Sequence, residues 1–550
     1  MKNTGSIKWI AKRIRPYIPG LILLILMATC VSYIGVRFAL VSRSLIDTAT
    51  GQAEGNVMHS VLSLVILLIV QLLLQVMYIR IHIHISGKLA MDIRTDLYFQ
   101  LMKKDFRSVS ALHSGEVLNR LVSDVSLVTE KTTEIIPNVF ALLSTVVFSF
   151  SALYMLDKYF ALACLAFGPV VMLAAYIYKK RIKTLHLQCR ESDGKVRSFL
   201  QETIQNFLVV KAFGRENLMR AKSEELQQQN FRLHVKRSTV GILSNVLFFV
   251  AVTAGYYAAL AWSVYRLSLG LITFGTVTAV LGLVGQLQTP FRELAAVLPQ
   301  CYMVSASAQR LMDLEQIKDE ENAASPADEN FEFEAICFED ISFHYGEIPV
   351  LENVNLTVHK GEFVALCGPS GGGKSTMTRL LLSVLEPESG TVYLQNADGK
   401  RIPFTSATRK LFSYVPQGNM ILSGTISENI AFGDENPDME KVQRALDLAQ
   451  LTEAVQKMPK GLDTVLGEKG LGLSEGQIQR IAIARALYHD APILLLDEAT
   501  SSLDIPTEKS LLEHIRSMTD KTCIIVSHRK EVMDACDRTY YLQNGSLHEL

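Results

Sequence analysis

The chain has 550 residues, of which 49% are hydrophobic and 20% charged, and its mean hydropathy is +0.21. This hydropathy is high for a soluble protein although the charged fraction is ordinary, so the composition favours a membrane part joined to a soluble part. A net charge of −1 gives no electrostatic reason to expect a nucleic-acid partner. The eight cysteines are scattered singly, which disfavours a disulfide framework or a structural metal site.

The first 300 residues contain six apolar stretches, and each approaches the roughly 20 residues that a helix needs to cross a bilayer. We place these predicted spans at about 20–42, 59–82, 133–156, 159–179, 238–264 and 270–290. Basic residues gather before the first span, between the second and third, and between the fourth and fifth. The positive-inside rule therefore predicts a multi-pass protein of the cell membrane with both termini in the cytoplasm.

The two long cytoplasmic connections show apolar residues at three- and four-residue spacing, as in SGEVLNRLVSDVSLV. This spacing predicts helices that continue from the spans beyond the bilayer. Such helices either remain solvated or serve as docking struts for a soluble domain. Their length and cytoplasmic placement favour struts.

Polar side chains occur inside the predicted spans, where an unpaired amide costs free energy. They must therefore face other helices or a wet cavity. Hydrogen bonding between helices and the lining of a substrate path are both open interpretations. The candidates for a substrate path are Gln71, Gln75, Asn245, Tyr256 and Gln286.

The composition changes near residue 315. Residues 319–330 are acidic, rich in small residues and interrupted by a proline, which is typical of a linker. We therefore expect an all-α membrane domain at 1–314, a linker at 315–332 and an α/β domain at 333–550.

A glycine-rich turn in the soluble part lies between a strand-like stretch, FVALC, and a helix-like stretch, TMTRLLLSVL. The turn fits the phosphate-loop pattern GxxxxGK[ST], and the strand–loop–helix setting makes the match specific. We expect Lys374 to reach the β- and γ-phosphates of a nucleotide and the Ser375 hydroxyl to hold Mg²⁺. The predicted loop residues are Gly368, Pro369, Ser370, Gly371, Gly372, Gly373, Lys374, Ser375 and Thr376.

Two later strand-like stretches end in polar residues. PILLLDE ends in Asp497, suited to holding Mg²⁺ through water, and Glu498, suited to polarising an attacking water. TCIIVSH ends in His528, which can contact the γ-phosphate. Strands alternating with helices predict a mainly parallel sheet with the site at the carboxyl ends of its strands.

The motifs GPSGGGKST, YVPQ, LSEGQ, ILLLDEATSSLD and VSH, in this order and spacing, resemble the nucleotide-binding domain of the ABC transporter superfamily. Six spans ahead of such a domain resemble the half-transporter exporters of the multidrug, lipid and peptide type. The stretches FRSVSALHSGEVLNRLVSDV and QETIQNFLVVKAFGRE resemble the two cytoplasmic coupling regions of that family.

The resemblance implies roles for individual residues. Tyr345 would stack on adenine, and Gln417 would touch Mg²⁺ and link the site to the membrane half. Glu498 would be the catalytic base and His528 the switch histidine. The signature residues Ser474, Gly476 and Gln477 would contact ATP bound to a partner subunit, and the loop from Ser501 to Asp504 would meet that partner.

The signature departs from the usual family form at Glu475, where glycine is usual, and at Ile478, where arginine is common. A solvent-facing Glu475 beside a working motif is the favoured interpretation, and a slow site is the alternative. The chain ends at Leu550, so we expect an abbreviated C-terminal part. The short segment before the first span cannot hold a peptidase, so we do not expect leader-peptide processing.

The chain contains one phosphate loop, one signature and six predicted spans. These features predict one subunit of a dimeric transporter that hydrolyses ATP with Mg²⁺. A homodimer is sufficient, and a heterodimer with a related chain is open. Export of amphipathic, lipid-like or peptide-like substrates is the leading hypothesis. Import of the metal-chelate type and a membrane-anchored regulatory ATPase are the alternatives. Cys367, beside the phosphate loop, is either a site of inhibition by alkylation or a buried thiol.

Overall fold

The computed structural model describes residues 3–112, 114–320, 332–418, 421–467, 473–518 and 521–550. Within its helices, the side chains at 3–4, 163–183, 244–245, 247–248, 292 and 295–296 lie outside the description. The chain forms two compact units. The first comprises Met1–Leu101 and Ser114–Gln316, and the second comprises Met102–His113 and Ile317–Leu550. The second unit therefore includes a short stretch that the sequence places between two membrane helices.

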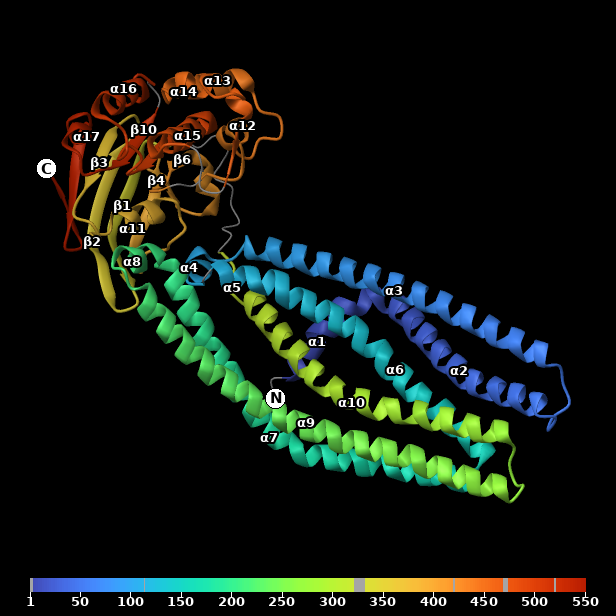
Figure 1. The fold of residues 1–550 in the computed structure, drawn as a ribbon. Helices are drawn as coiled ribbons and strands as arrows, with labels where there is room; N and C mark the ends of the chain where they lie inside the picture. The colour runs from blue at the N-terminus through green and yellow to red at the C-terminus, as the bar shows by residue number, and fades with distance from the viewer. Residues whose placement is uncertain (1–2, 113, 321–331, 419–420, 468–472, 519–520) are drawn as a thin grey trace. The chain divides into compact units, whose positions relative to one another are not determined.

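The first unit consists of helices joined by short turns in its described residues (Figure 1). Its elements are α1 (Asn3–Ile14), the 3-10 turn η1 (Arg15–Tyr17), α2 (Ile18–Ala49), α3 (Val57–Leu101), α5 (Ser114–Asn119), the π-helical turn η2 (Arg120–Asp124), α6 (Val125–Leu156), α7 (Lys158–Gln205), α8 (Phe207–Ala212), α9 (Glu216–Ser268) and α10 (Phe274–Glu315). Helix α9 has 53 residues, which at 1.5 Å per residue is about 80 Å and far exceeds the ~30 Å hydrocarbon core of a bilayer.

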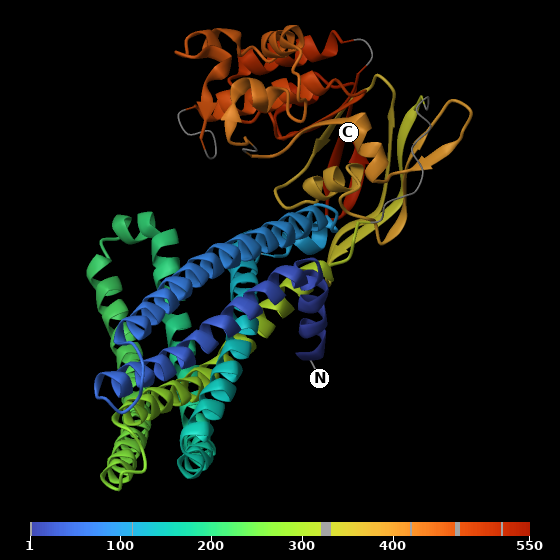
Figure 2. The same cartoon turned by 90° about the vertical axis from the view of Figure 1, so that its right-hand side faces the viewer.

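Helices α2, α6 and α10 pack against one another, α3 packs against α2 and α6, and α7 pairs with α9 (Figure 2). Among the described residues, three helical stretches are long and apolar enough to cross a membrane: Gly5–Ala49, Val57–Leu101 and Ser114–Leu156. They contain the first three predicted spans. The fourth and fifth predicted spans fall within α7 and α9, and the sixth, except for its first four residues, falls within α10. Large apolar side chains on α3, among them Leu72 and Leu73, are exposed, as a lipid-facing surface requires.

The turn between α9 and α10 is fixed by Asp47 near the end of α2. Asp47 accepts hydrogen bonds from the Thr273 hydroxyl and the Gly275 amide, both at 2.9 Å. A Cβ atom at Gly275 would lie 2.4 Å from the Arg43 carbonyl oxygen, so this close approach requires glycine. Thr273 itself caps α10 by accepting from the Thr276 amide.

The second unit contains a six-stranded sheet, a four-stranded antiparallel sheet and a two-stranded ribbon. The six-stranded sheet has the order β12-β11-β3-β10-β9-β6, and all its described pairings except β11–β12 are parallel. The strands are β1 (Ala335–Tyr345), β2 (Ile348–His359), β3 (Phe363–Cys367), β4 (Ser389–Gln395), β5 (Arg401–Pro403), β6 (Phe412–Val415), β7 (Gly424–Thr425), β8 (Val465–Leu466), β9 (Ile493–Asp497), β10 (Thr522–Val526), β11 (Arg538–Gln543) and β12 (Ser546–Glu549).

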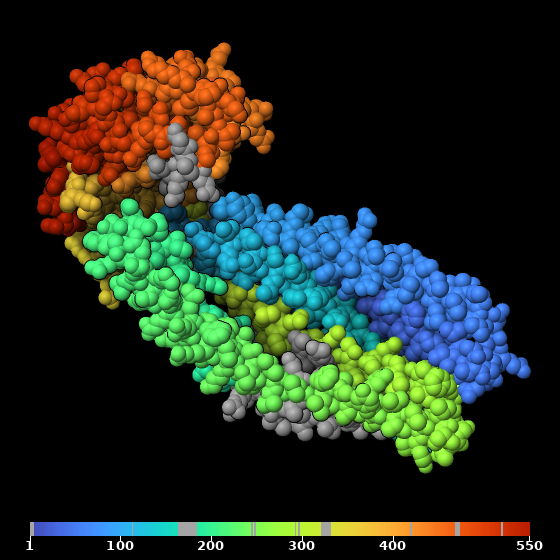
Figure 3. All heavy atoms as spheres, in the orientation of Figure 1, coloured from blue at the N-terminus to red at the C-terminus, as the bar shows by residue number. Residues whose placement is uncertain are grey.

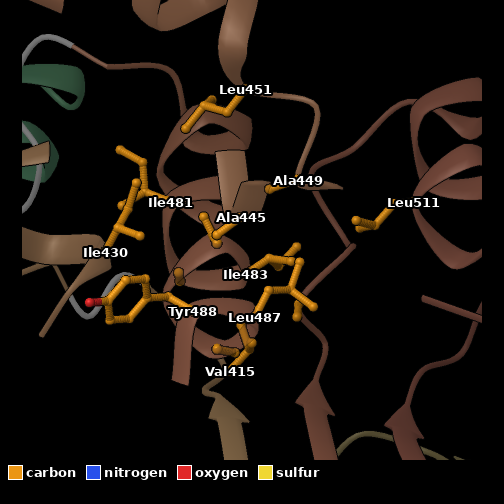
Figure 4. Close-up of a cluster of buried hydrophobic side chains, with 14 of the residues drawn as sticks. Val415, Ile430, Ala445, Ala449, Leu451, Ile481, Ile483, Leu487, Tyr488 and Leu511 are labelled. Atoms are coloured by element: carbon orange, nitrogen blue, oxygen red, sulfur yellow. The ribbon is translucent and has the colours of Figure 1, made fainter. Parts of the chain in front are cut away.

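The helices of this unit pack on the sheets and on one another. They are α4 (Phe106–Ser110), α11 (Lys374–Leu381), η3 (Ser406–Leu411), α12 (Ile426–Ile430), α13 (Met439–Leu448), α14 (Thr452–Gln456), η4 (Gly461–Asp463), α15 (Glu475–His489), α16 (Ile505–Arg516) and α17 (Lys530–Asp534). One buried core joins the two larger sheets to α11 and includes Phe343, Leu366 and Met377. A second core packs α15 against α12, α13 and the strand ends, with Ile430, Ile483 and Val415 among its members (Figure 4). Alternate residues of β9 enter the two cores, which therefore lie on opposite faces of the six-stranded sheet.

Candidate active site

The phosphate loop follows β3, whose five residues are all buried. Gly368, Gly371 and Gly373 have φ values of 145°, 78° and 102°, a region that side-chain-bearing residues rarely adopt. A Cβ atom at Gly368 would lie 2.3 Å from the Leu542 carbonyl oxygen. The backbone therefore turns tightly before α11 begins at Lys374, and it forms a cradle that only glycines allow.

Lys374 is 7% exposed, and its ammonium group is held inside this loop. The Lys374 Nζ atom donates to the carbonyl oxygens of Gly368 and Pro369 at 2.8 and 2.9 Å. These hydrogen bonds compensate for the burial of the Lys374 ammonium group. The positive charge therefore already lies within the phosphate loop. A phosphate group is the natural stronger partner for that charge.

Asp497 lies at the carboxyl end of β9, against α11. Its Oδ2 atom accepts from the Thr378 hydroxyl at 3.3 Å, whereas its Oδ1 atom is buried without a hydrogen-bond partner. Burial, reinforced by the nearby Glu498 charge, raises the pKa of Asp497. Burial and the Asp497 charge likewise raise the pKa of Tyr414. A buried acceptor left unsatisfied at a functional edge is suited to a cation or its water.

Glu498 and Gln417 are brought together by the structure. The Gln417 Nε2 atom donates to Glu498 Oε2 at 2.7 Å. Glu498 has a φ of 48°, and its amide donates to the Val526 carbonyl oxygen at 3.0 Å. This strained backbone, tied to the neighbouring strand, turns the carboxylate out of the sheet. His528 is exposed two residues beyond Val526, which pairs in register with Asp497, so it lies at the same edge.

Tyr345, at the end of β1, is 37% exposed. Its hydroxyl accepts from the Arg379 guanidinium of α11 at 3.1 Å, and its ring lies edge-on to Phe343 at 5.0 Å between centroids. Both contacts fix the orientation of the Tyr345 ring beside α11, the helix that follows the phosphate loop. A ring fixed in this way can stack on a planar base.

The signature serine caps α15 in a reciprocal arrangement. The Gln477 amide donates to Ser474 Oγ at 3.3 Å, and the Ser474 amide donates to Gln477 Oε1 at 2.9 Å. Gly476 approaches the Ser502 carbonyl oxygen so closely that a Cβ atom would lie 3.3 Å from it. Glu475 occupies the first turn of α15 and is exposed.

The predicted dimer-contact loop, Ser501 to Asp504, is held by two residues that sequence reasoning missed. Gln479, 8% exposed in α15, donates to Ser501 Oγ at 3.1 Å and accepts from the Ser502 amide at 3.1 Å. Arg529, next to His528, donates to the Ser501 and Leu503 carbonyl oxygens at 2.6 and 3.0 Å. The loop ends where Asp504 caps α16, and the hydrogen bond from Thr507 lowers the pKa of Asp504.

Arg529 is held in turn by Glu508 of α16, at 2.8 Å. Arg529 follows the VSH motif and Glu508 follows the DEATSSLD motif. Nearness to these motifs is the only signal for them in the sequence, and it does not predict their contact.

The candidate substrate-path residues have different surroundings. Gln286 of α10 donates to the Gly35 carbonyl oxygen of α2 at 2.9 Å and accepts from the Ser149 hydroxyl of α6 at 3.4 Å. It therefore joins three helices. Gln75 and Tyr256 are exposed and Gln71 is half-buried. The side chain of Asn245 lies outside the described residues.

The comparisons with known proteins agree with this layout. Residues 21–291 match the model of the ABC transporter transmembrane region, and residues 351–501 match the model named ABC transporter. The chain belongs to the ABC transporter superfamily. As an ABC transporter with both parts in one chain, it is a membrane-embedded half-transporter that binds ATP, hydrolyses it and couples hydrolysis to transport as a dimer.

Relatives and a solved structure have similar sequences or the same fold. An ATP-dependent lipid A-core flippase of Desulfotalea psychrophila is 29% identical over 476 residues, which cover 86% of this chain and 83% of the flippase. A protein described as a candidate multidrug export ATP-binding/permease protein of Staphylococcus aureus is 29% identical over 479 residues, covering 84% and 81%. The structure of a bacterial Atm1-family ABC exporter with ATP bound has a TM-score of 0.80 at 24% identity, covering 98% and 95%.

Proposed function

We propose that this ABC transporter exports amphipathic or lipid-like substrates and that two chains share two ATP sites. The observation that carries export is the layout: a helical membrane part is fused ahead of the ATPase domain, and 98% of the chain has the fold of a bacterial exporter. Relatives named as a lipid A-core flippase and a multidrug export protein support amphipathic substrates. The cluster of basic residues in the cytoplasmic segments supports an ATPase domain on the cytoplasmic side.

In the proposed site, ATP lies between the phosphate loop of one subunit and the signature of its partner. Lys374 exchanges its two backbone carbonyl partners for the β- and γ-phosphates. The Ser474 hydroxyl accepts from the Gln477 amide, so its own hydrogen remains available to donate to a phosphate across the interface. Tyr345 stacks on adenine, and the loop from Ser501 to Asp504 meets the partner.

Residues of this chain also fit Mg²⁺. Among the described residues, no group of three or more His, Cys, Asp or Glu side chains could hold a metal ion. Ser375, Gln417 and Asp497 would hold it, and the unsatisfied Asp497 Oδ1 atom is the acceptor that supports this assignment. When bound, the ion supplies charge neutralisation at the phosphate oxygens.

Glu498 is the proposed general base, because its carboxylate projects from the sheet edge and a single amide from Gln417 holds it. The carboxylate accepts a proton from the attacking water, which then adds to the γ-phosphorus as the bond to the β-phosphate oxygen breaks. His528 contacts the γ-phosphate from the neighbouring strand.

The α8 turn is the part of the first unit best suited to meeting a partner subunit. It joins α7 to α9 (Figure 1), and its atoms lie on the face seen in Figure 3. It carries exposed apolar side chains, with Leu208 80% and Phe213 74% exposed. Such an exposed apolar patch is suited to packing against apolar side chains of a second chain. A second copy of this chain is sufficient, because Glu498 and the signature serine are both present.

Inside-out and right-side-out vesicles containing the purified protein test the direction of transport. The probes are the amphipathic dye Hoechst 33342 and a fluorescent phospholipid. We expect ATP-dependent accumulation in inside-out vesicles and none with Glu498→Gln, which still binds ATP. Accumulation only in right-side-out vesicles would indicate import. ATP hydrolysis without accumulation in either orientation would favour a regulatory ATPase.

A further inference from the structure

Two chain segments that are far apart in sequence pair in the second unit. The segment 102–105 leads into α4, and the segment 317–320 follows α10; we call the pair the strap. Lys104 and Asp319 form an antiparallel bridge. The Asp105 amide donates to the Lys318 carbonyl oxygen at 3.0 Å, and the Glu320 amide donates to the Lys103 carbonyl oxygen at 2.9 Å.

Side chains reinforce this pairing. The Lys104 Nζ atom lies 2.7 Å from Asp319 Oδ1, and the Lys104 side chain is only 5% exposed. Asp105 then caps α4 by accepting from the Ser108 amide at 2.9 Å. The strap therefore fixes where α4 begins.

Arg409 of η3 connects the strap to the helix of the phosphate loop. Its guanidinium forms a bidentate ion pair with Glu320, with one contact at 3.0 Å. The same guanidinium donates to the carbonyl oxygens of Leu382 and Ser383, each at 2.7 Å, just beyond the last turn of α11. A planar fork can hold a carboxylate and two carbonyls at once, whereas an ammonium group cannot reproduce this geometry.

A second connection runs to the adenine side of the site. The Arg107 guanidinium of α4 lies 5.6 Å from the Phe343 ring centroid. Phe343 in turn packs edge-on against Tyr345, whose hydroxyl bonds to Arg379 of α11. Two connections therefore run from the first turn of α4 to α11, the helix that begins at Lys374.

We propose that Arg409 is a positioning residue, and that through Glu320 and the strap it makes α4 move with α11 when nucleotide binds. The inference rests on the proposed function only in assuming that movement of α4 drives transport. Helices α3 and α10 end at Leu101 and Glu315, immediately before the two strands of the strap. A shift of α11 is thus transmitted to the C-terminal ends of α3 and α10 through backbone hydrogen bonds and ion pairs.

Hydrogen–deuterium exchange of the full-length protein in lipid nanodiscs tests this, with and without Mg-ATP and vanadate. In the wild type, nucleotide should slow exchange severalfold in peptides covering 361–382 and 102–112. In Arg409→Gln and in Glu320→Gln, peptides covering 361–382 should be protected as in the wild type, whereas the change at 102–112 should fall below twofold. Arg409→Lys should be intermediate. The matched control is Arg401→Gln, which removes an exposed ion pair with Glu339 in the same domain and should match the wild type.

ATP hydrolysis and dye transport give the second readout. The KM for ATP should stay within twofold of the wild type in Arg409→Gln, while dye accumulated per ATP hydrolysed in inside-out vesicles falls severalfold. Equal protection of 102–112 in Arg409→Gln and the wild type would overturn the proposal. Loss of protection at 361–382 in the variant would also overturn it, because Arg409 would then merely support the fold of the site. If the wild type shows both exchange changes but accumulates no dye, the proposed export is refuted, whereas the proposed coupling of α4 to α11 through the strap is not.

Discussion

Replacing Arg529 by methionine should destabilise the ATPase domain strongly, because it leaves a buried carboxylate unpaired. The Glu508 side chain is 1% exposed, and its Oε1 atom already lacks a hydrogen-bond partner. Arg529, with a side chain 26% exposed, supplies the 2.8 Å contact to the other oxygen. Removing one partner of a buried ion pair costs roughly 3–5 kcal/mol. Since Arg529 is partly solvated, we expect about 3 kcal/mol.

In a domain of this size, 1 kcal/mol shifts the melting temperature by roughly 2–4 °C, so the variant should melt about 6–12 °C lower. Calorimetry of the full-length protein is the assay. Tryptophan fluorescence would not follow this event, because both tryptophans, Trp9 and Trp262, lie in the first unit.

Two controls separate the buried charge from general damage. In Arg529→Met combined with Glu508→Gln, the remaining side chain is neutral, so about half of the loss should be recovered. Arg401→Met, which removes an exposed pair, should change the melting temperature by less than about 2 °C. A shift for Arg529→Met no larger than that of Arg401→Met, or a double variant no more stable than the single one, would refute the reasoning.

Further outcomes follow from the site. Burial raises the folded pKa of Asp497, so its ionised form costs stability as the pH rises through that pKa. Asp497→Asn should therefore melt about 2–4 °C higher at pH 7 while losing ATP hydrolysis, and calorimetry should show the gain disappear at about pH 4. Cys367 is 1% exposed and burial raises its pKa, so we expect maleimide at pH 7.5 to leave the ATPase rate unchanged; rapid inactivation that Cys367→Ala prevents would contradict this. Glu475 is exposed, so Glu475→Gly should change the ATPase rate by less than about fivefold, whereas a tenfold increase would identify the acid as a brake.

Much of the fold could be predicted from the sequence, because its signals are local. Apolar runs of membrane length indicated the long helices, and the strand–loop–helix pattern around Gly368 and Lys374 indicated the phosphate site. The family resemblance confirmed by the comparisons rests on such motifs.

Contacts between buried polar groups could not be predicted in the same way. Gln286 carries an amide in a predicted span, and only the approach of α2 and α6 shows that it bonds to Gly35 and Ser149. Arg529 and Gln479 lie beside known motifs. Their hydrogen bonds to Ser501 nevertheless depend on how α15, α16 and the end of β10 pack together. The strap joins residues more than two hundred positions apart through two short backbone segments that carry no periodic pattern.

The membership of Met102–His113 in the second unit changes where the ATPase domain can be separated from the rest. A polypeptide that begins at residue 317 would look complete in the sequence, yet it would lack a piece of its own fold. Residues 318 to 320 would lose their antiparallel partner, and Phe343 would lose the guanidinium that lies over its ring. A soluble form of this domain would therefore be assembled from two separate stretches of the chain, with 102–113 supplied as a tethered or added peptide.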